Sequence, residues 1–170
     1  GVTFSLTADS DSVLSIDGYS SARFAARGIK KRKLELLVDS PKHVPVQVSE
    51  APDGTRLQAG HDGYDSTHGL THARTLELTF NGRGLAGEDM LLAMEDASKK
   101  RFEKRMDELN LQGVAFSIRF HLHPEVDAAL DMGDTAVSIA QKSGELWVFR
   151  HDGIAELSLE PSVYHAKGSL

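Results

Sequence analysis

Apolar and polar residues alternate along much of this chain, in short runs that end at turn-forming residues. The stretch Val114–Pro124 alternates over its whole length, so its larger apolar side chains fall on one face and its smaller or polar ones on the other. This pattern predicts a half-buried strand over Val114–Leu122. The polar face of this strand would carry Arg119, His121 and His123 in a row, with a core on the opposite face.

Further runs with strand character occur from one end of the chain to the other. They are Val2–Thr7, Val13–Ile16, Leu34–Val38, His43–Ser49, Arg56–Ala59, Leu70–Phe80, Leu85–Met94, Ala136–Ala140, Leu146–Arg150, Ala155–Glu160 and Val163–Ala166. Glycine-containing pairs between them predict tight turns, because glycine adopts positive φ without steric cost. These pairs are Asp17-Gly18, Asp53-Gly54, Asp62-Gly63, Asn81-Gly82, Ser143-Gly144 and Asp152-Gly153. The pattern predicts an all-β fold, an antiparallel β-sandwich of many short strands.

One stretch, Asp96–Leu109, differs from the rest. It is rich in charge and places Phe102, Met106 and Leu109 at helical spacing, which predicts either one short helix or a charged loop.

Length and composition narrow the class of protein. The 170 residues fit a single domain over residues 1–170, and a start directly on strand-like sequence suggests a domain cut from a longer protein. The formal net charge of −6 argues against a general nucleic-acid binder. The chain has no cysteine, which excludes disulfides and thiolate metal sites, and it has no apolar run long enough for a membrane span.

Three roles are possible for the two histidines of the Val114–Pro124 stretch. On a strand, His121 and His123 would point the same way and could chelate a metal together with a third ligand. They could equally place a base and a charge beside a bound polymer, or be structural histidines on an outer face.

A second group of candidates lies earlier in the chain. On the strand Leu70–Phe80, His72 and Arg74 share a face that we expect to be core toward the carboxyl end. Glu88 and Asp89, across the hairpin, are the natural partners of Arg74, so a structural ion pair competes with substrate binding as its role.

The segment His61–Tyr64 is predicted to be a turn after a strand. His61 could serve as a base and Tyr64 as an acid or base, and the alternative is an ordinary turn flanked by surface side chains.

Two basic runs stand out in this acidic chain. The first comprises Arg27, Lys30, Lys31, Arg32 and Lys33, and the second comprises Lys99, Lys100, Arg101, Lys104 and Arg105. Either run could contact a polyanion, although such runs more often form a solvated face.

Several short motifs occur in an order that resembles one family. They are His61-Asp-Gly-Tyr64, His72-Ala-Arg74, Gly87-Glu-Asp89, Arg119-Phe-His-Leu-His-Pro124, Gly144-Glu-Leu-Trp-Val-Phe149 and Glu160-Pro-Ser-Val-Tyr164. Together they look like the carboxyl-terminal β domain of heparinase II/III-like proteins, in a bacterial branch of that superfamily, from about Ser20 to Tyr164.

The resemblance implies a two-domain parent protein, with an amino-terminal α/α toroid that is absent from this chain and a carboxyl-terminal antiparallel β-sandwich. Family members with known activity are polysaccharide lyases that cleave uronic-acid-containing chains by β-elimination. This reaction needs a group that neutralises the uronate carboxylate, a base for the C5 proton and an acid for the leaving O4 oxygen.

On this basis His121, His123 and His61 are the candidate bases or charge stabilisers. The candidate substrate-binding residues are Arg119, Arg74, His72 and Tyr64. The expected partners are an acidic polysaccharide and the toroid, and the family suggests a periplasmic location. Relatives often carry a histidine where this chain has Asp11, so we predict no metal and no cofactor.

Because the toroid and its tyrosine are absent, we expect the chain to be inactive alone. The alternatives are a non-catalytic module that binds a glycan or braces the toroid, and a metal-dependent β protein that uses His121 and His123.

Overall fold

The computed structural model describes residues 2–6, 14–29, 32–153 and 155–161. Contacts within the chain divide it into two compact units. Unit 2, residues 20–113, is inserted into unit 1, which comprises residues 1–19 and 114–170. The expected strand Val163–Ala166 and the segment around Asp11 lie outside the described residues. That the whole chain forms one domain stays a prediction.

Unit 1 contains two small sheets. Its strands are β1 (Val2–Leu6), β2 (Leu14–Ile16), β9 (Phe116–Arg119), β10 (Val126–Asp131), β11 (Ala136–Gln141), β12 (Leu146–Arg150) and β13 (Ala155–Leu159). The first sheet has the order β13-β1-β9-β2, and the second is the antiparallel meander β10-β11-β12. In the first sheet β1 runs parallel to both β9 and β13, so this sheet is mixed.

The core of unit 1 is an apolar layer between these sheets. Val137 on β11 and Leu157 on β13 are its buried centre. The half-buried side chains that pack against them come from β10, β11, β12, β13 and the segment after β9: Phe120, Leu122, Ala128, Ile139, Phe149 and Leu159. The apolar face predicted for the strand at Val114–Leu122 therefore contributes to this core, which gives unit 1 its sandwich character.

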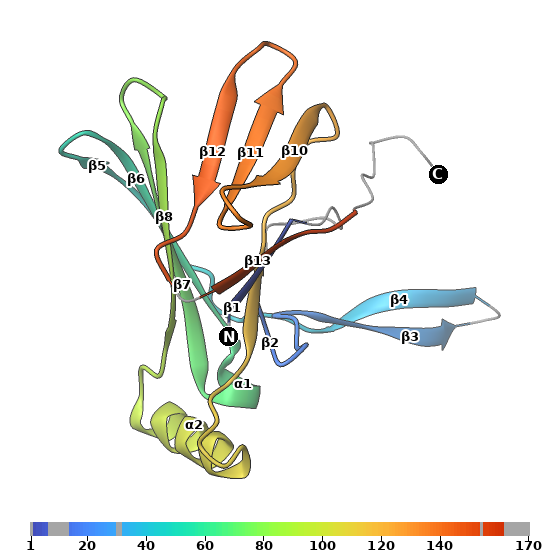
Figure 1. Ribbon diagram of the computed structural model, residues 1–170. Coiled ribbons are helices and arrows are strands. Elements are labelled where there is room, and N and C mark those ends of the chain that lie inside the picture. The colour runs from blue at the N-terminus through green and yellow to red at the C-terminus, as the bar shows by residue number, and fades with distance from the viewer. Residues whose placement is uncertain (1, 7–13, 30–31, 154, 162–170) are drawn as a thin grey trace. The chain divides into compact units, whose positions relative to one another are not determined.

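Unit 2 contains two further sheets and both helices. Its elements are β3 (Arg23–Ile29), β4 (Arg32–Asp39), β5 (Val46–Ala51), β6 (Gly54–Tyr64), α1 (Asp65–His68), β7 (Leu70–Thr79), β8 (Leu85–Leu92) and α2 (Asp96–Glu108). Strands β5 to β8 form an antiparallel sheet in chain order, and β3 and β4 form a separate two-stranded ribbon (Figure 1).

The all-β class is confirmed, and Asp96–Glu108 is a helix rather than a loop. The Asp17-Gly18 turn is also confirmed: both residues have positive φ, and Ile16 and Tyr19 exchange two backbone hydrogen bonds across it. The strands β3 and β10 were not predicted. Both are rich in small or charged residues, so their strand state depends on pairing with β4 and β11 and not on their own pattern.

Two predictions about local structure are wrong. Strand β9 covers only Phe116–Arg119, because its ladders with β1 and β2 end at Arg119 and Ile118. The Asp62-Gly63 pair is not a turn after a strand but lies within β6, where a bulge accommodates it.

Candidate functional site

The bulge in β6 brings two predicted site residues onto one face of the sheet. His61 lies opposite His72 and Tyr64 lies opposite Leu70, so β6 advances by one residue more than β7 between these pairs. The rings of His61 and Tyr64 consequently meet, with centroids 5.4 Å apart. Without the bulge, residues three positions apart would lie on opposite faces.

Gly63 makes this bulge possible. A Cβ atom at Gly63 would lie 2.8 Å from the backbone oxygen of Ser21, closer than real Cβ contacts come. The carboxylate of Asp62 fixes the other side of the bulge, because its Oδ1 accepts hydrogen bonds from the backbone N–H groups of Lys42 (2.7 Å) and His43 (3.2 Å).

A continuous hydrogen-bonded network crosses the sheet from this bulge. His61 Nε2 lies 3.2 Å from His72 Nδ1, and His72 Nε2 lies 2.6 Å from Asp89 Oδ1. Arg74 donates from Nε to Asp89 Oδ1 (2.7 Å) and from Nη2 to Asp89 Oδ2 (3.2 Å). We call His61, His72, Arg74 and Asp89 the His–Asp network.

The direction of each hydrogen bond in the His–Asp network follows from one backbone group. The N–H of Gly63 donates to His61 Nδ1 (3.2 Å), so this nitrogen carries no proton. A neutral His61 must then carry its proton on Nε2 and donate to His72 Nδ1. His72, in turn, carries its proton on Nε2 and donates to Asp89. Gly63 therefore sets the tautomers of both histidines.

Burial and charge are balanced within this network. Burial alone would raise the pKa of Asp89, but hydrogen bonds from His72 and Arg74, together with the charge of Arg74, outweigh it and hold the pKa below its usual value. Burial lowers the pKa of His61. The neighbouring His72 and Arg74 lower this pKa further, whereas the carboxylate of Asp62 raises it. At neutral pH the carboxylate of Asp89 thus compensates the guanidinium of Arg74, while His61 stays neutral.

Tyr64 is fully buried, and burial raises its pKa to about 12 despite its hydrogen bonds with Ser21. A phenol in this state keeps its proton at neutral pH and has no exposed surface with which to meet a ligand. The structure therefore gives Tyr64 a packing position beside His61.

The two helices close the same end of the sheet. Asp65 of α1 accepts hydrogen bonds from Ser98 (2.6 Å) and from Arg101 Nη2 (2.6 Å), both on α2. Gly69, which ends α1 with φ +68°, lies so close to α2 that a Cβ atom would stand 2.1 Å from the backbone oxygen of Ser98. The end of the sheet that carries His72 is thereby tied to α2.

The burial of β7 is the reverse of the prediction. His72 is 6% exposed, whereas Leu78 and Phe80 at the carboxyl end are 46% and 70% exposed. The polar end can be buried because Asp89 accepts hydrogen bonds from His72 and Arg74, and His61 donates to Nδ1 of His72. The predicted ion pair between Arg74 and Asp89 is confirmed.

The three remaining site candidates lie in unit 1. Arg119 is the last residue of β9, and His121 follows the strand, both half-buried. His123 is exposed, and its Nδ1 accepts a hydrogen bond from the backbone N–H of Glu125 (3.2 Å) in the turn that Pro124 begins. Because the strand has ended, His121 and His123 do not share a strand face with Arg119 as predicted.

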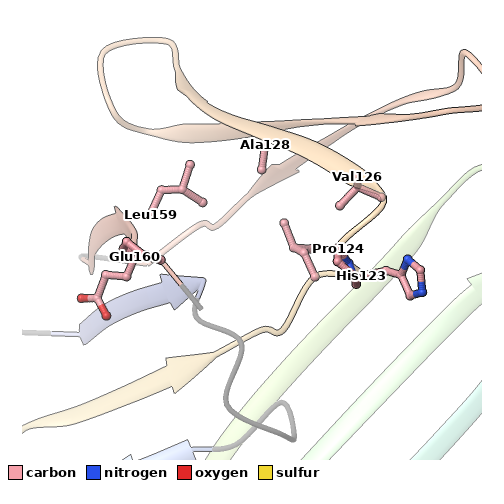
Figure 2. A pocket seen from close by; sticks show the side chains of 8 residues that line it. His123, Pro124, Val126, Ala128, Leu159 and Glu160 are labelled. Carbon is pink, nitrogen blue, oxygen red and sulfur yellow. The ribbon is translucent and has the colours of Figure 1, made fainter. Parts of the chain in front are cut away.

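A pocket of about 400 Å³ lies beside His123 (Figure 2). Its lining comes from the segment after β9, from β10 and from the end of β13: Leu122, His123, Pro124, Val126, Ala128, Leu159, Glu160 and Pro161. Most of these residues are apolar, and His123 and Glu160 supply the titratable groups. Among the described residues, no cluster of three or more histidine or acidic side chains is arranged to hold a metal ion.

The structure thus gathers His61, Tyr64, His72 and Arg74 in unit 2 and leaves Arg119, His121 and His123 in unit 1. Asp89, which joins the unit 2 residues, was foreseen only as a partner of Arg74. The tight turn predicted at Asn81-Gly82 was the available signal for the position of Asp89. A β7–β8 hairpin that turns there sets Asp89 directly opposite Arg74.

The basic run on α2 is largely compensated within unit 2. Lys99 pairs with Asp96, Lys104 and Arg105 pair with Glu108, and Arg101 pairs with Asp65. This arrangement matches the solvated-face reading of that run. None of the helices in the described part of the chain is both long and apolar enough to cross a membrane.

Comparisons with known proteins identify the class of domain. Residues 5–170 match the family described as heparinase II/III-like, C-terminal. A protein of Caulobacter vibrioides named FtsZ-localized protein C is 31% identical over 132 residues, which cover 78% of this chain. The matched region spans about a fifth, 22%, of the length of that relative. No solved structure gives a significant match to this chain.

Proposed function

Since this chain belongs to the heparinase II/III-like family and is a polysaccharide-lyase-related C-terminal domain, we propose that it serves a lyase acting by β-elimination on an acidic, uronic-acid-containing polysaccharide. In this proposal the domain is inactive alone and works beside an α/α toroid in a periplasmic protein. The match over residues 5–170 is the observation that carries the proposal.

The geometry refines which residues would serve the reaction. Arg74 and His72 already neutralise and hydrogen-bond Asp89, so they are positioning residues and not receptors for a substrate carboxylate. Both nitrogens of His61 are also engaged, by Gly63 and by His72. We therefore assign His61 a positioning role in place of the base.

The segment after β9 then supplies the groups for the polysaccharide. Arg119 would hold the uronate carboxylate, since a guanidinium matches a carboxylate with two parallel hydrogen bonds. His121 or His123 would act as the base or stabilise the developing charge, because an imidazole can accept a proton and can carry a positive charge. The acid for the leaving oxygen would come from the toroid.

The test is an assay of the full-length protein that carries this domain. It is incubated with alginate, polyglucuronate, heparin, chondroitin sulfate and hyaluronan, and unsaturated uronate ends are followed by their ultraviolet absorbance. We expect product from the full-length protein and none from the 170-residue chain. His121→Ala and Arg119→Ala should each lower kcat/KM at least about a hundredfold, while Lys142→Ala leaves it unchanged.

A second candidate is a non-catalytic module, and two observations favour it. Four of the predicted site residues lie in a buried region that contains its own compensating charge. The relative from Caulobacter vibrioides carries a name that records localisation with FtsZ. In this case the domain would brace the rest of its parent protein or recruit a partner, and the parent protein would be localised with FtsZ.

The full-length protein that carries this domain also distinguishes the lyase from the non-catalytic module. Absence of unsaturated products across the whole panel, together with co-sedimentation of the full-length protein with FtsZ polymers, would replace the lyase proposal by the module. Product formation without co-sedimentation would leave the lyase proposal standing alone.

A further inference from the structure

The chain just before β5 is attached to the bulge in β6 by hydrogen bonds. The backbone N–H groups of Lys42 and His43 donate to Asp62 Oδ1 at 2.7 and 3.2 Å. The N–H of Gly60 donates to the carbonyl oxygen of Pro45 at 3.1 Å. We call residues 42–43 the tethered segment. Both of its residues are exposed, so apolar burial contributes little to its position, and the Asp62 carboxylate holds it.

The conformation of this bulge is matched to a neutral His61. The N–H of Gly63 donates to His61 Nδ1 at 3.2 Å, and Nε2 of the same ring lies 3.2 Å from His72 Nδ1. A second proton on the ring would sit on Nδ1 and face the N–H of Gly63, and two donors cannot bond to each other. Space on the other side of Gly63 is also limited, because a Cβ atom there would lie 2.8 Å from the backbone oxygen of Ser21. Protonation of His61 therefore leaves the Gly63 N–H without its acceptor in a confined position.

The charged groups on the neighbouring strands do not favour a positive His61. On β7 these groups are His72 and Arg74, and on β8 the carboxylate of Asp89 already accepts hydrogen bonds from both of them. Burial, His72 and Arg74 each lower the pKa of His61 from its ordinary value of 6.5. His61 is consequently neutral at neutral pH and takes up its second proton only in acid.

Asp62 connects a charge on His61 to the tethered segment. Its carboxylate favours the positive form of His61, and the same carboxylate accepts from the N–H groups of Lys42 and His43. Of the charges that the tethered segment itself carries, His43 acts on Asp62, and Lys42 acts on Asp65 of α1. A protonated His61 competes with the two N–H groups for the Asp62 carboxylate, so the added charge weakens the attachment of the tethered segment.

We propose that the bulge and the tethered segment form a pH-sensitive latch with His61 as its sensor. With neutral His61 the latch is closed, and Asp62 holds the tethered segment against β6. Proton uptake by His61 opens the latch: the Gly63 N–H loses its acceptor, Asp62 turns toward the charged imidazole, and the tethered segment detaches. The opening is local, because the ladders of β6 with β5 and β7 include neither Asp62 nor Gly63.

A second histidine makes the same local hydrogen bond and provides an internal control. His123 Nδ1 accepts from the N–H of Glu125 two residues later, at 3.2 Å, as His61 does from Gly63. His123 and Glu125 are exposed, so water can accept from the Glu125 N–H when His123 takes up a proton. The latch therefore requires burial and the connection through Asp62 in addition to the histidine–amide hydrogen bond.

The test follows the isotope-labelled 170-residue chain by NMR from about pH 7.5 to about pH 4.5. Hydrogen exchange is measured for the amides of Lys42, His43 and Gly63 and is corrected for the intrinsic pH dependence of exchange. We expect their protection to fall at least about tenfold, with a midpoint below pH 6.5 that coincides with the titration of the His61 ring. Amides of the β6–β7 ladder should change by no more than about twofold.

Single glutamine variants distinguish the latch from its alternatives. His61→Gln should remove the pH response of these amides, whereas His43→Gln and His123→Gln should keep it. An unchanged response in His61→Gln would overturn the proposal, as would constant protection in wild type or loss of the response in His43→Gln. Loss of protection over the whole of unit 2 would overturn it in favour of global acid unfolding.

A wild-type measurement decides the question if His61→Gln does not fold. In that case the latch stands only if the midpoint of amide opening coincides with the titration of the His61 ring, and separate midpoints would overturn it. The readout requires no polysaccharide, so its outcome does not depend on that of the lyase assay.

Discussion

The two units of this chain bury different kinds of side chain. Unit 1 encloses an apolar layer centred on Val137 and Leu157. Unit 2 encloses charge and hydrogen bonds: His72 is 6% exposed, and the side chains of Asp89 and Arg74 are 11% and 15% exposed. Truncating an apolar side chain in a core lowers the free energy of unfolding roughly in proportion to the atoms removed. Removing one member of a buried charged pair also leaves its partner as an uncompensated charge.

The largest effect should therefore come from unit 2. Asp89→Ala removes the only carboxylate in the described His–Asp network and leaves Arg74 charged and partly buried. We expect the free energy of unfolding to fall by about 4 kcal/mol, measured by urea denaturation at neutral pH.

Asp127→Ala, an exposed aspartate on β10, is the matched control and should change the free energy of unfolding by no more than about 0.5 kcal/mol. Asp89→Asn keeps an acceptor for His72 but loses the charge, so it should fall between the two. Equal effects of Asp89→Ala and Asp127→Ala would show that the network does not hold unit 2 together.

The next effect should come from the apolar layer of unit 1. Leu157→Ala opens a cavity at a position that is 6% exposed, and we expect a loss of about 3 kcal/mol by the same measurement. Leu157→Met, which conserves volume, should cost less than about 1.5 kcal/mol. If the two variants were equally unstable, cavity formation would not be the cause.

The pH dependence of the free energy of unfolding should distinguish unit 2 from unit 1. Burial holds the pKa of His61 below its ordinary value of 6.5, so below that pH the unfolded chain binds more protons than the folded one. The contribution of His61 to stability is complete above pH 6.5 and is lost as the pH falls toward the folded-state pKa. Protonation of Nδ1 would also remove the acceptor of the Gly63 N–H.

Urea denaturation at about pH 7.5 and about pH 5.5 measures this difference. We expect His61→Gln to lose less stability between these two values than wild type does, because it lacks the titrating group. Leu157→Ala should keep the wild-type pH dependence while being less stable at both values. An unchanged pH dependence in His61→Gln would contradict the assignment of neutral His61.

The apolar core could be predicted from the sequence to a greater extent than the buried hydrogen-bonded network. Alternation identified most strands and the inward-facing side chains of Ile118, Phe120 and Leu122, because apolar side chains are buried whatever their neighbours are. The enclosure of His72 and Arg74 depends on partners in β6 and β8, and no property of β7 alone reveals it.

The shortness of β9 had the same kind of cause. Its length is set by where β1 and β2 stop pairing, not by its own alternation, which continues to His123. The interpretation of His121 and His123 as neighbours on a strand failed for this reason. The bulge at Asp62-Gly63 was mistaken for a turn because the same residue pair favours both structures.

The bulge in β6 changes which face of the sheet the odd-numbered and even-numbered residues occupy. Along an uninterrupted strand, odd and even positions keep to their own faces, but after Asp62-Gly63 the assignment is exchanged. Deleting either residue would remove the bulge and leave Tyr64 two positions after His61, still on the same face of the sheet. The extra residue is therefore not what places Tyr64 beside His61; it supplies the Asp62 carboxylate that accepts from the backbone of Lys42 and His43, and the Gly63 N–H that donates to His61.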